Sequence, residues 1–330
     1  MSGQGLLQLS WRPYRFDLPR RLITSRGALV QRRGWLLRLS TPDGHCGWGE
    51  AAAPLLEESD TDLAAAIAAV PAAIERGALE LQLPQLPPAL ACGLGMALAD
   101  LDGLGSVAQG GWRSAPAAAW LLPAGEAAVP ALEQVLSQDC IHPLQPLTLK
   151  WKVAAVGDAE ERALLDALLQ RLPPAARLRL DANGGWDRLT AGQWVDRLES
   201  EPRLEWLEQP LAPHDLQGLE ALAARVPVAL DESLAHLSEQ QRLAWSGWLV
   251  RRPLQEGDPR PLLRQLEAGA APRQMLSTAF ETGIGHRFLE HLAALQADGP
   301  TPAAPGLAPG WSPGGDLFSA DPQRVWEAAA

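Results

Sequence analysis

Short apolar segments alternate with amphipathic helical stretches along the chain from about Ala115 onward. The apolar segments are AAAWLL, LTLKWKV, LRLDA, LEWLEQ, VPVALDE, GWLVRR and RQMLSTA. This alternation is typical of parallel strands that are joined by right-handed helical crossovers. Seven such strands, with a possible eighth near PAAPGL, predict an α/β fold with a TIM-like (β/α)7β barrel. A doubly wound sheet stays open as an alternative, although no GxGxxG motif follows a first strand.

The pattern in the first part of the chain is different. The segment GWLLRLS (Gly34–Ser40), a turn at PDGH and the segment GWGEAAAP predict strands and their connection. Two alanine-rich segments, Asp60–Arg76 and Pro88–Gly103, predict helices. We therefore expect a mixed α+β domain in front of the barrel.

Composition and charge narrow the class of protein. The chain of 330 residues carries a net charge of −11 that is spread along its length, which argues against nucleic acid or an anionic membrane as partner. No apolar run reaches the roughly 18 residues of a membrane-spanning helix, and the N-terminus lacks the features of a signal peptide. The cysteines Cys46, Cys92 and Cys140 are widely spaced and indicate reduced thiols in a cytoplasmic protein. The six histidines form no HExxH motif, so histidine metal chemistry is not expected.

Lysine is used only twice, at Lys150 and Lys152, although the chain has 28 basic residues. Arginine stays protonated at working pH, whereas a buried lysine can lose its proton and act as a base. The two residues lie on a predicted strand, two positions apart, so both amines would emerge on one face and lower each other's pKa. A solvated strand face is the plainer alternative, but the absence of lysine elsewhere favours a catalytic pair.

Three carboxylates follow successive predicted strands. Asp181 ends RLRLD, Glu208 ends LEWLE and Asp231 ends VPVALD, at separations of 27 and 23 residues that each fit one βα repeat. In parallel barrels the active site gathers at the C-terminal ends of the strands, so the three carboxylates are predicted to converge beside the lysines. Hard oxygen ligands of this kind suit Mg²⁺. Helix N-caps are the alternative role for a single such residue.

The combination of these motifs resembles the enolase superfamily, and within it the o-succinylbenzoate synthase family. The resemblance covers nearly the full length and rests on TSRG, GWGEAAAP, KWK, LDANGGW, LEQPL, LDES and LSTAFETGIG. Members of the superfamily pair a lysine or histidine base with Mg²⁺. The resemblance implies an α+β capping domain of residues 1–112, joined by the tail of about 310–330, and a barrel catalytic domain of residues 113–309.

The resemblance also implies roles for the lysines and the carboxylates. Lys152 would be the general base and then the general acid, and Lys150 would assist it electrostatically. The Mg²⁺ ligands would be Asp181, Glu208 and Asp231.

Further residues are implied to contact or cover the substrate. Arg179 resembles a position that faces the substrate, and Ser277 and Thr278 resemble contacts to a succinyl group. The segment DLPRRLITSRG would be a lid from the capping domain, with a plain surface loop as the alternative.

The sequence departs from the superfamily pattern at Arg252, in WLVRRPLQEG, where a second lysine is usual. A racemase needs a base on each face of its substrate, and arginine is a poor base. Arg252 therefore favours the synthase over a racemase. The resemblance to the synthase family then implies the syn-dehydration of 2-succinyl-6-hydroxy-2,4-cyclohexadiene-1-carboxylate in menaquinone or phylloquinone biosynthesis, carried out by a monomer or homo-oligomer. N-acylamino acid racemase, a muconate-type cycloisomerase and a catalytically inactive barrel used for binding stay open as alternatives.

Overall fold

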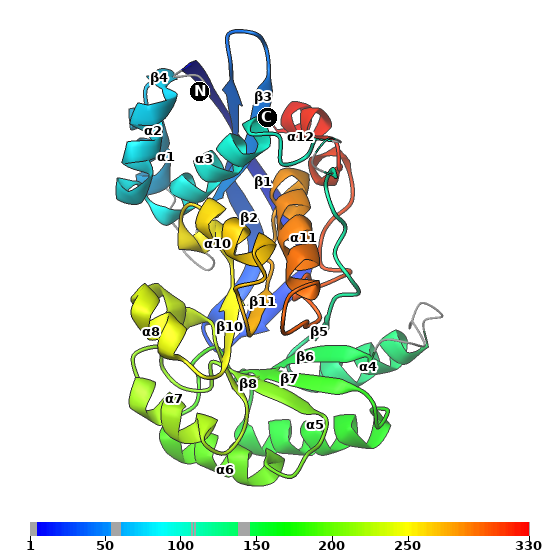
Figure 1. Ribbon diagram of the computed structural model, residues 1–330. Helices are drawn as coiled ribbons and strands as arrows, with labels where there is room; N and C mark the ends of the chain where they lie inside the picture. The colour runs from blue at the N-terminus through cyan, green and yellow to red at the C-terminus, as the bar shows by residue number, and fades with distance from the viewer. Residues whose placement is uncertain (1–4, 54–60, 107, 109, 138–145, 330) are drawn as a thin grey trace.

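The computed structural model describes residues 5–53, 61–106, 108, 110–137 and 146–329. Two β-sheets organise this part of the chain, one antiparallel and one parallel. In Figure 1 the blue antiparallel strands and the cyan helices occupy the upper part, and most of the green and yellow parallel strands lie in the lower part. Cys140, one of the three predicted thiols, lies outside the described residues.

The first part of the chain forms the antiparallel sheet, with the strand order β3-β2-β1-β4, and packs three helices against it. The strands are β1 (Leu6–Thr24), β2 (Gly27–Ser40), β3 (Cys46–Ala52) and β4 (Ala73–Glu75). The helices are α1 (Thr61–Ala69), α2 (Arg76–Gln82) and α3 (Pro88–Leu101). The predicted strands around Gly34–Ser40 and GWGEAA, and the predicted helix that starts at Pro88, are confirmed. Gly49 is required by close packing, because a Cβ there would lie 1.8 Å from the carbonyl oxygen of Gly93 on α3.

The single helix predicted over Asp60–Arg76 is wrong in its second half. Helix α1 ends at Ala69, and the chain then forms the short strand β4, which pairs with the start of β1. Pro71 explains the break, because a proline lacks the backbone N–H that a helix interior needs and its ring clashes with the preceding turn.

The second part of the chain forms a curled seven-stranded parallel sheet. Its strands are β5 (Trp120–Leu122), β6 (Thr148–Lys152), β7 (Arg177–Asp181), β8 (Leu204–Glu208), β9 (Val228–Leu230), β10 (Trp248–Arg251) and β11 (Gln274–Leu276). The connecting helices are α4 (Ala128–Leu136), α5 (Asp158–Arg171), α6 (Arg188–Leu198), α7 (Leu216–Ala223), α8 (Glu239–Ala244), α9 (Pro253–Glu256), α10 (Arg260–Glu267) and α11 (Gly283–Ala297). All seven predicted strands are present. Within the described residues, no helix combines the length and apolar character that crossing a bilayer requires.

The strand order of the parallel sheet excludes the doubly wound alternative. The strands follow one another in chain order from β5 to β11, whereas a doubly wound sheet reverses its order at a switch point. Residues near the predicted eighth strand form backbone hydrogen bonds beside both the first strand, β5, and the last strand, β11, of this sheet. Gly306 forms a single parallel bridge with Ser277, and the N–H of Ala119 donates to the carbonyl oxygen of Pro305 at 2.9 Å.

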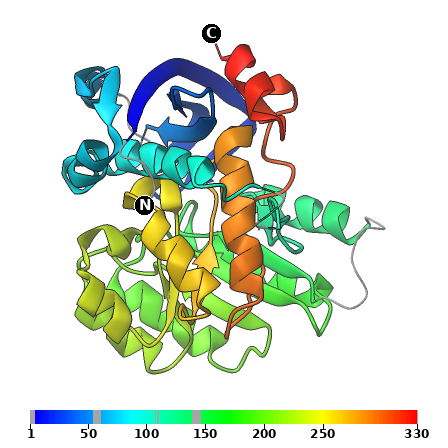
Figure 2. The same ribbon diagram turned by 45° about the horizontal axis from the view of Figure 1, so that its top comes forward.

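The C-terminal helix α12 (Pro322–Ala328) returns to the antiparallel sheet. Val325 and Trp326 are buried against Tyr14 and Leu36 of strands β1 and β2. Figure 2 shows this helix in red beside the blue strands. The two ends of the chain therefore belong to one packed unit.

The segment DLPRRLITSRG is the far end of a β-hairpin rather than a plain surface loop. Strands β1 and β2 pair in register from Gln8 to Asp17 and, after an irregularity, again from Leu22 to the turn at Thr24–Gly27. The hairpin reaches from the antiparallel sheet to the parallel sheet (Figure 1). The lid position implied by the resemblance is therefore formed by the paired ends of β1 and β2 and the turn between them.

Glu50 on strand β3 joins the two sheets. Its carboxylate is fully buried and accepts hydrogen bonds from the Tyr14 hydroxyl at 2.5 Å and the Thr282 hydroxyl at 2.6 Å. It also accepts from the backbone N–H of Gly285 at 3.1 Å, in the first turn of α11. A negative charge is favourable at this end of a helix, because the free N–H groups point toward it. Glu50 of the GWGE motif thus anchors α11, the helix that follows β11 and the residues Ser277 and Thr278.

We expect Glu50→Ala to lower the free energy of unfolding by about 3 kcal/mol, because several buried donors lose their acceptor at once. Tyr14→Phe removes only one of these donors and is the matched control, with an expected loss of about 1 kcal/mol. Urea unfolding followed by tryptophan fluorescence measures both. An unfolding midpoint of Glu50→Ala equal to that of the native protein would contradict this role.

Candidate active site

Lys150 and Lys152 lie side by side on the inner face of strand β6. Their neighbours Leu149 and Trp151 point the other way and belong to the core that packs under the helices. Both lysines are 5% exposed, so the pair is buried and the solvated strand face is excluded. The predicted alternation of side chains is confirmed.

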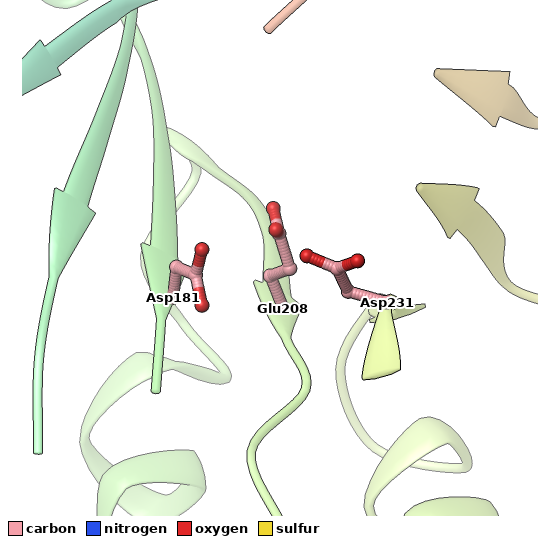
Figure 3. Close-up of side chains that lie close together, drawn as sticks. All are labelled: Asp181, Glu208 and Asp231. Atoms are coloured by element: carbon pink, nitrogen blue, oxygen red, sulfur yellow. The ribbon is translucent and has the colours of Figure 1, made fainter. Parts of the chain in front are cut away.

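The three carboxylates converge, as predicted from their spacing. Lys152, Asp181 and Glu208 are neighbours across strands β6, β7 and β8, and Asp231 follows the end of β9. One carboxylate oxygen from each of the three residues lies within 4.8 Å of the others. Figure 3 shows the three side chains turned toward one another.

The alternative role as helix N-caps is wrong for these residues. Helix α6 is capped by the side chain of Asp187, and α7 is capped by that of Asp215. Asp231 precedes a short 3-10 helix, Glu232–His236, but makes no capping hydrogen bond. The three carboxylates therefore do not cap the helices that follow their strands.

Cationic side chains surround the three carboxylates. Lys150 Nζ lies 2.5 Å from Glu208 Oε1 and 2.7 Å from Asp181 Oδ2, and Lys152 Nζ lies 2.6 Å from Asp181 Oδ2. On the other side, Arg252 donates to Asp231 Oδ2 at 2.5 Å and, from its Nε, to Asp231 Oδ1 at 2.9 Å. The site is thus an ion cluster in a low-dielectric interior, where such contacts are strong.

Burial and neighbouring charges compete for each pKa in this cluster. Burial lowers the pKa of Lys150, but Asp181 and Glu208 raise it more, so that it lies above the usual value for lysine. The lowered value expected from repulsion between the two lysines is therefore wrong for Lys150 in this arrangement. Burial, followed by the charge of Asp181, raises the pKa of Glu208. Burial raises the pKa of Asp231, but the positive charge of Arg252 lowers it more, so that the pKa lies below the usual value for aspartate.

The donor set fits a divalent cation. Oε2 of Glu208 is buried and, within the part of the chain that the structure describes, has no hydrogen-bond partner. A buried carboxylate oxygen without a donor is costly, and a cation ligand is the partner that would satisfy it. Three carboxylates with no nitrogen or sulfur donor are the type of ligand set that Mg²⁺ prefers. The residues Asp181, Glu208 and Asp231 could hold the ion.

Lys150 and Lys152 line a cavity. Its polar lining consists of Lys150, Lys152, Arg252, Ser277 and Thr278. Its apolar lining includes Leu22 from the β1–β2 hairpin, Leu121 from β5, and Phe280 and Ala308 from the chain after β11. Ser277 and Thr278, two of the predicted contact residues, and Leu22 of the predicted lid therefore border the same space as the lysines.

Ser277 and Thr278 meet the cavity in different ways. Ser277 is 3% exposed, and its hydroxyl reaches the Gly306 carbonyl oxygen at the long distance of 3.5 Å. The Thr278 hydroxyl donates to Glu281 and accepts from the N–H of Phe280 at 2.8 Å. Since the Thr278 hydroxyl is already committed, Ser277 has the freer polar side chain for a ligand.

Arg179 does not line this cavity. It is fully buried on the inner face of β7, where it bonds to Glu205 Oε2 at 2.6 Å and to the Ala304 carbonyl oxygen at 2.8 Å. Its guanidinium also stacks over Trp206, with 4.0 Å to the ring centroid. The structure thus brings Arg179 together with the next strand rather than with the other site residues, and its contact with substrate stays a prediction.

Asn183 and Glu232 were not singled out from the sequence, yet they contact the site. Asn183 Oδ1 accepts from Lys152 Nζ at 2.8 Å, and Asn183 Nδ2 donates to Glu232 Oε1 at 2.9 Å. Both follow a proposed metal ligand by one or two positions, in the motifs LDAN and LDES. The motifs LDAN and LDES therefore contained these residues. Only the path of the loops after β7 and β9 determines that the Asn183 side chain contacts Lys152 and that Glu232 contacts Asn183.

Comparisons with known proteins agree with this site. The family model described as "Enolase C-terminal domain-like" matches residues 146–249. The o-succinylbenzoate synthase of Thermosynechococcus vestitus is 35% identical over 300 residues, which cover 87% of this chain and 88% of that protein. The chain belongs to the enolase superfamily. A chloromuconate cycloisomerase of Pseudomonas putida, from the same comparison, is 30% identical but over only 46% of this chain and 39% of its own length.

Two solved structures match this enolase superfamily member over nearly all of its length. The crystal structure of o-succinylbenzoate synthase from Thermosynechococcus elongatus BP-1, complexed with Mg in the active site, superimposes with a TM-score of 0.78. It is 32% identical, and the match covers 97% of this chain and 99% of that one. The L-Ala-D/L-Glu epimerase of Bacillus subtilis has a TM-score of 0.75 at 20% identity, over 94% and 92% of the two chains, and supports the fold alone.

Proposed function

We propose that this superfamily member is an o-succinylbenzoate synthase. It would convert 2-succinyl-6-hydroxy-2,4-cyclohexadiene-1-carboxylate into 2-succinylbenzoate and water, with a divalent cation, Mg²⁺, held by Asp181, Glu208 and Asp231. The full-length likeness to a synthase supports this assignment within the superfamily. The converging carboxylates and the buried lysine pair support the metal-dependent chemistry.

The observation that carries the proposal is a pair of residues that line the cavity, one of which can act as a base and one of which cannot. Lys152 enters it from β6, and Arg252 enters from the end of β10, with three strands between them in the sheet. Arginine does not give up its proton at working pH, and the contact with Asp231 raises its pKa further against the effect of burial. The site therefore has a usable base on one side only, which suits a syn-elimination.

The reaction needs one residue to move a proton twice. Lys152 Nζ takes the proton from the ring carbon that bears the carboxylate, and the C–H electron pair enters the ring. The neighbouring C–O bond then breaks, and the departing hydroxide receives the proton from the Lys152 ammonium to leave as water. When bound, a divalent cation supplies positive charge for the substrate carboxylate and for the charge that develops on it. Lys150 adds a further fixed positive charge beside the carboxylates of Asp181 and Glu208.

The direct test is the formation of 2-succinylbenzoate from the cyclohexadiene, followed by absorbance. We expect turnover with Mg²⁺, loss of turnover with a chelator and recovery when Mg²⁺ is restored in excess. Product formation that ignores the chelator would argue against the metal, and the absence of product with Mg²⁺ present would overturn the proposed function.

Racemisation should be negligible because the second face lacks a base. We expect a single enantiomer of an N-acylamino acid to keep its configuration when it is incubated with the native protein and Mg²⁺ in D₂O, as followed by polarimetry and mass spectrometry. Efficient racemisation with deuterium uptake would show a second base and favour the racemase alternative.

Variants of Arg252 separate its charge from proton transfer. We expect Arg252→Met to slow dehydration by roughly 1–2 kcal/mol in activation free energy, because a desolvated cation near the planar ring is lost. Arg252→Lys keeps the charge and should retain dehydration, and it is the matched control. Equal rates for Arg252→Met and the native protein would show that this charge does not contribute.

A muconate-type cycloisomerase is the second candidate, since a chloromuconate cycloisomerase matches the part of the chain that includes the site. That match spans less than half of either chain, whereas the synthase matches nearly all of both. Parallel assays with muconate and with the cyclohexadiene separate the two functions, and we expect turnover with the cyclohexadiene alone.

We also propose that the curled sheet is a (β/α)7β barrel of residues 113–309 with a capping domain of residues 1–112 and about 310–330. The bonds of Pro305 and Gly306 to the two outermost strands support closure by an eighth strand. The packing of α12 on strands β1 and β2 supports the assignment of the C-terminal tail.

The chemistry of the product supports a proposed pathway, and the cysteines support a proposed location. 2-Succinylbenzoate is a precursor of menaquinone or phylloquinone, so we propose a place in one of these two pathways. Cys46 and Cys92 are free thiols, which supports the proposed cytoplasmic location.

A further inference from the structure

The hairpin tip, Thr24–Gly27, is a tight turn with a defined shape. Thr24 pairs with Gly27, which leaves Ser25 and Arg26 as the two residues of the turn. The Thr24 hydroxyl donates to the Gly27 carbonyl oxygen at 3.1 Å and accepts from the N–H of Arg26 at 3.2 Å. Gly27 has φ of +132°, a conformation that favours glycine over residues with a side chain. The TSRG motif therefore encodes a tight turn at the tip of the hairpin.

The tip contacts the loop that follows Asp181. The hydroxyl of Ser25 is shared between the carbonyl oxygens of Ala182, at 2.9 Å, and Asn183, at 3.2 Å. Arg26 Nη1 lies 3.8 Å from Glu232 Oε1, next to Asp231. A hairpin of the antiparallel sheet thus touches the residues directly after two proposed metal ligands.

The loop leaves space for this contact at Gly185. A Cβ at Gly185 would lie 2.6 Å from Ser25 Cβ and 2.8 Å from Ala154 Cβ, closer than carbon atoms approach. The second glycine of LDANGGW is therefore needed where the hairpin tip packs. This steric requirement is independent of the hydrogen bonds of Ser25 and points to the same docked position.

Asn183 connects the docked tip to Lys152. Its backbone has φ of +45°, in the left-handed region, and its N–H donates to Asp181 Oδ1 at 3.0 Å. Its side-chain oxygen accepts from Lys152 Nζ at 2.8 Å. The Ser25 hydroxyl donates to the carbonyl oxygens of Ala182 and Asn183, which belong to the two peptide units on either side of the Asn183 Cα. The tip therefore restrains the backbone that orients the side-chain amide of Asn183.

We propose that the hairpin tip is a latch that positions Lys152, with Ser25 acting through Asn183. Leu22 on the same strand lines the cavity, so one closed hairpin both covers the substrate and fixes the amide that holds the amine. When the tip is released, the peptide units of Asn183 lose this restraint, and the amide that accepts from Lys152 Nζ is held only by the bonds of Asn183 to Asp181 and Glu232. Ser25 is a positioning residue for the reaction, and this inference rests on the proposed synthase function.

Ser25→Ala tests the latch, and Ser40→Ala is its matched control. Ser40 lies at the other end of the same hairpin, and its hydroxyl also donates to a backbone carbonyl, that of Gln8 at 3.5 Å. We expect Ser25→Ala to lower the single-turnover rate of dehydration by about threefold to tenfold, the effect of one hydrogen bond. Substrate KM, Mg²⁺ affinity and the thermal midpoint should change little, and Ser40→Ala should behave as the native protein.

A double-mutant cycle and an activity-free measurement complete the test. Gly185→Ala displaces the tip, so adding Ser25→Ala to it should lower the rate no further. Hydrogen–deuterium exchange at the tip amides should be faster in Ser25→Ala than in the native protein, whatever the substrate.

Each result has a defined meaning. A native single-turnover rate in Ser25→Ala, a rise in KM alone, full additivity in the cycle, or unchanged exchange at the tip would overturn the latch. Absence of turnover in the native protein would instead refute the proposed function, while the exchange data would still report whether Ser25 docks the tip.

Discussion

Lys152→Arg should reduce the dehydration rate by on the order of 10³-fold or more, because arginine cannot exchange its proton at working pH. In the native protein Lys152 Nζ lies 2.6 Å from Asp181 Oδ2, and the substitution keeps a positive charge beside this oxygen. The fold should therefore survive while proton transfer fails. Initial rates of 2-succinylbenzoate formation measure the effect, and circular dichroism with thermal unfolding checks the fold.

Lys150→Arg is the matched control for this experiment. Lys150 lies on the same face of the same strand and is equally buried, but its contacts are to Glu208 and Asp181 and its proposed part is electrostatic. We expect a much smaller loss of rate than for Lys152→Arg. Near-native turnover in Lys152→Arg, or equal losses in the two variants, would refute the assignment of Lys152 as the base.

Glu208→Gln should weaken binding of the divalent cation by on the order of 100-fold or more, since it removes one anionic ligand from the three. Burial and the charge of Asp181 raise the pKa of Glu208, so a neutral side chain of the same shape is tolerated there. The thermal midpoint of the metal-free variant should therefore be no lower than that of the metal-free native protein. Titration calorimetry with Mg²⁺ or Mn²⁺ measures binding, and the dehydration rate should fall with it.

Glu205→Gln controls for the loss of a buried carboxylate on the same strand. Glu205 pairs with Arg179 and Arg177 and lies outside the group of converging carboxylates. We expect this variant to lose stability, because Arg179 is left with a weaker partner in the interior, yet to keep its affinity for the cation. Native-like cation binding by Glu208→Gln would show that the metal site lies elsewhere.

The motifs carried most of the candidate site because strand geometry is regular. A period of two places Lys150 and Lys152 on one face, and a repeat length near 25 residues brings Asp181, Glu208 and Asp231 to the same end of the sheet. These inferences need only local geometry and parallel pairing. For the same reason the seven strands of the parallel sheet could be located from their apolar pattern.

Some contacts of the site could not be obtained in this way. Arg179 shares a face with Asp181, but its long side chain could turn toward the cavity or toward the next strand, and Glu205 with Trp206 decides the direction. The effect of the carboxylates on the pKa of Lys150 likewise depends on distances of 2.5 to 2.7 Å between groups from three strands. Neither property is a function of spacing along the chain.

The sequence by itself determined the strands, the lysine pair, the three carboxylates and the arginine that stands where a second lysine is usual. Only the tertiary structure decided that TSRG is the tip of a hairpin and that Ser25 lands beside Asn183, 158 residues further along the chain. It also decided that Glu50 anchors helix α11, more than 230 residues away. The physical reason is that periodicity reports which face a side chain occupies, whereas hydrogen bonds between distant segments depend on how whole sheets pack against each other.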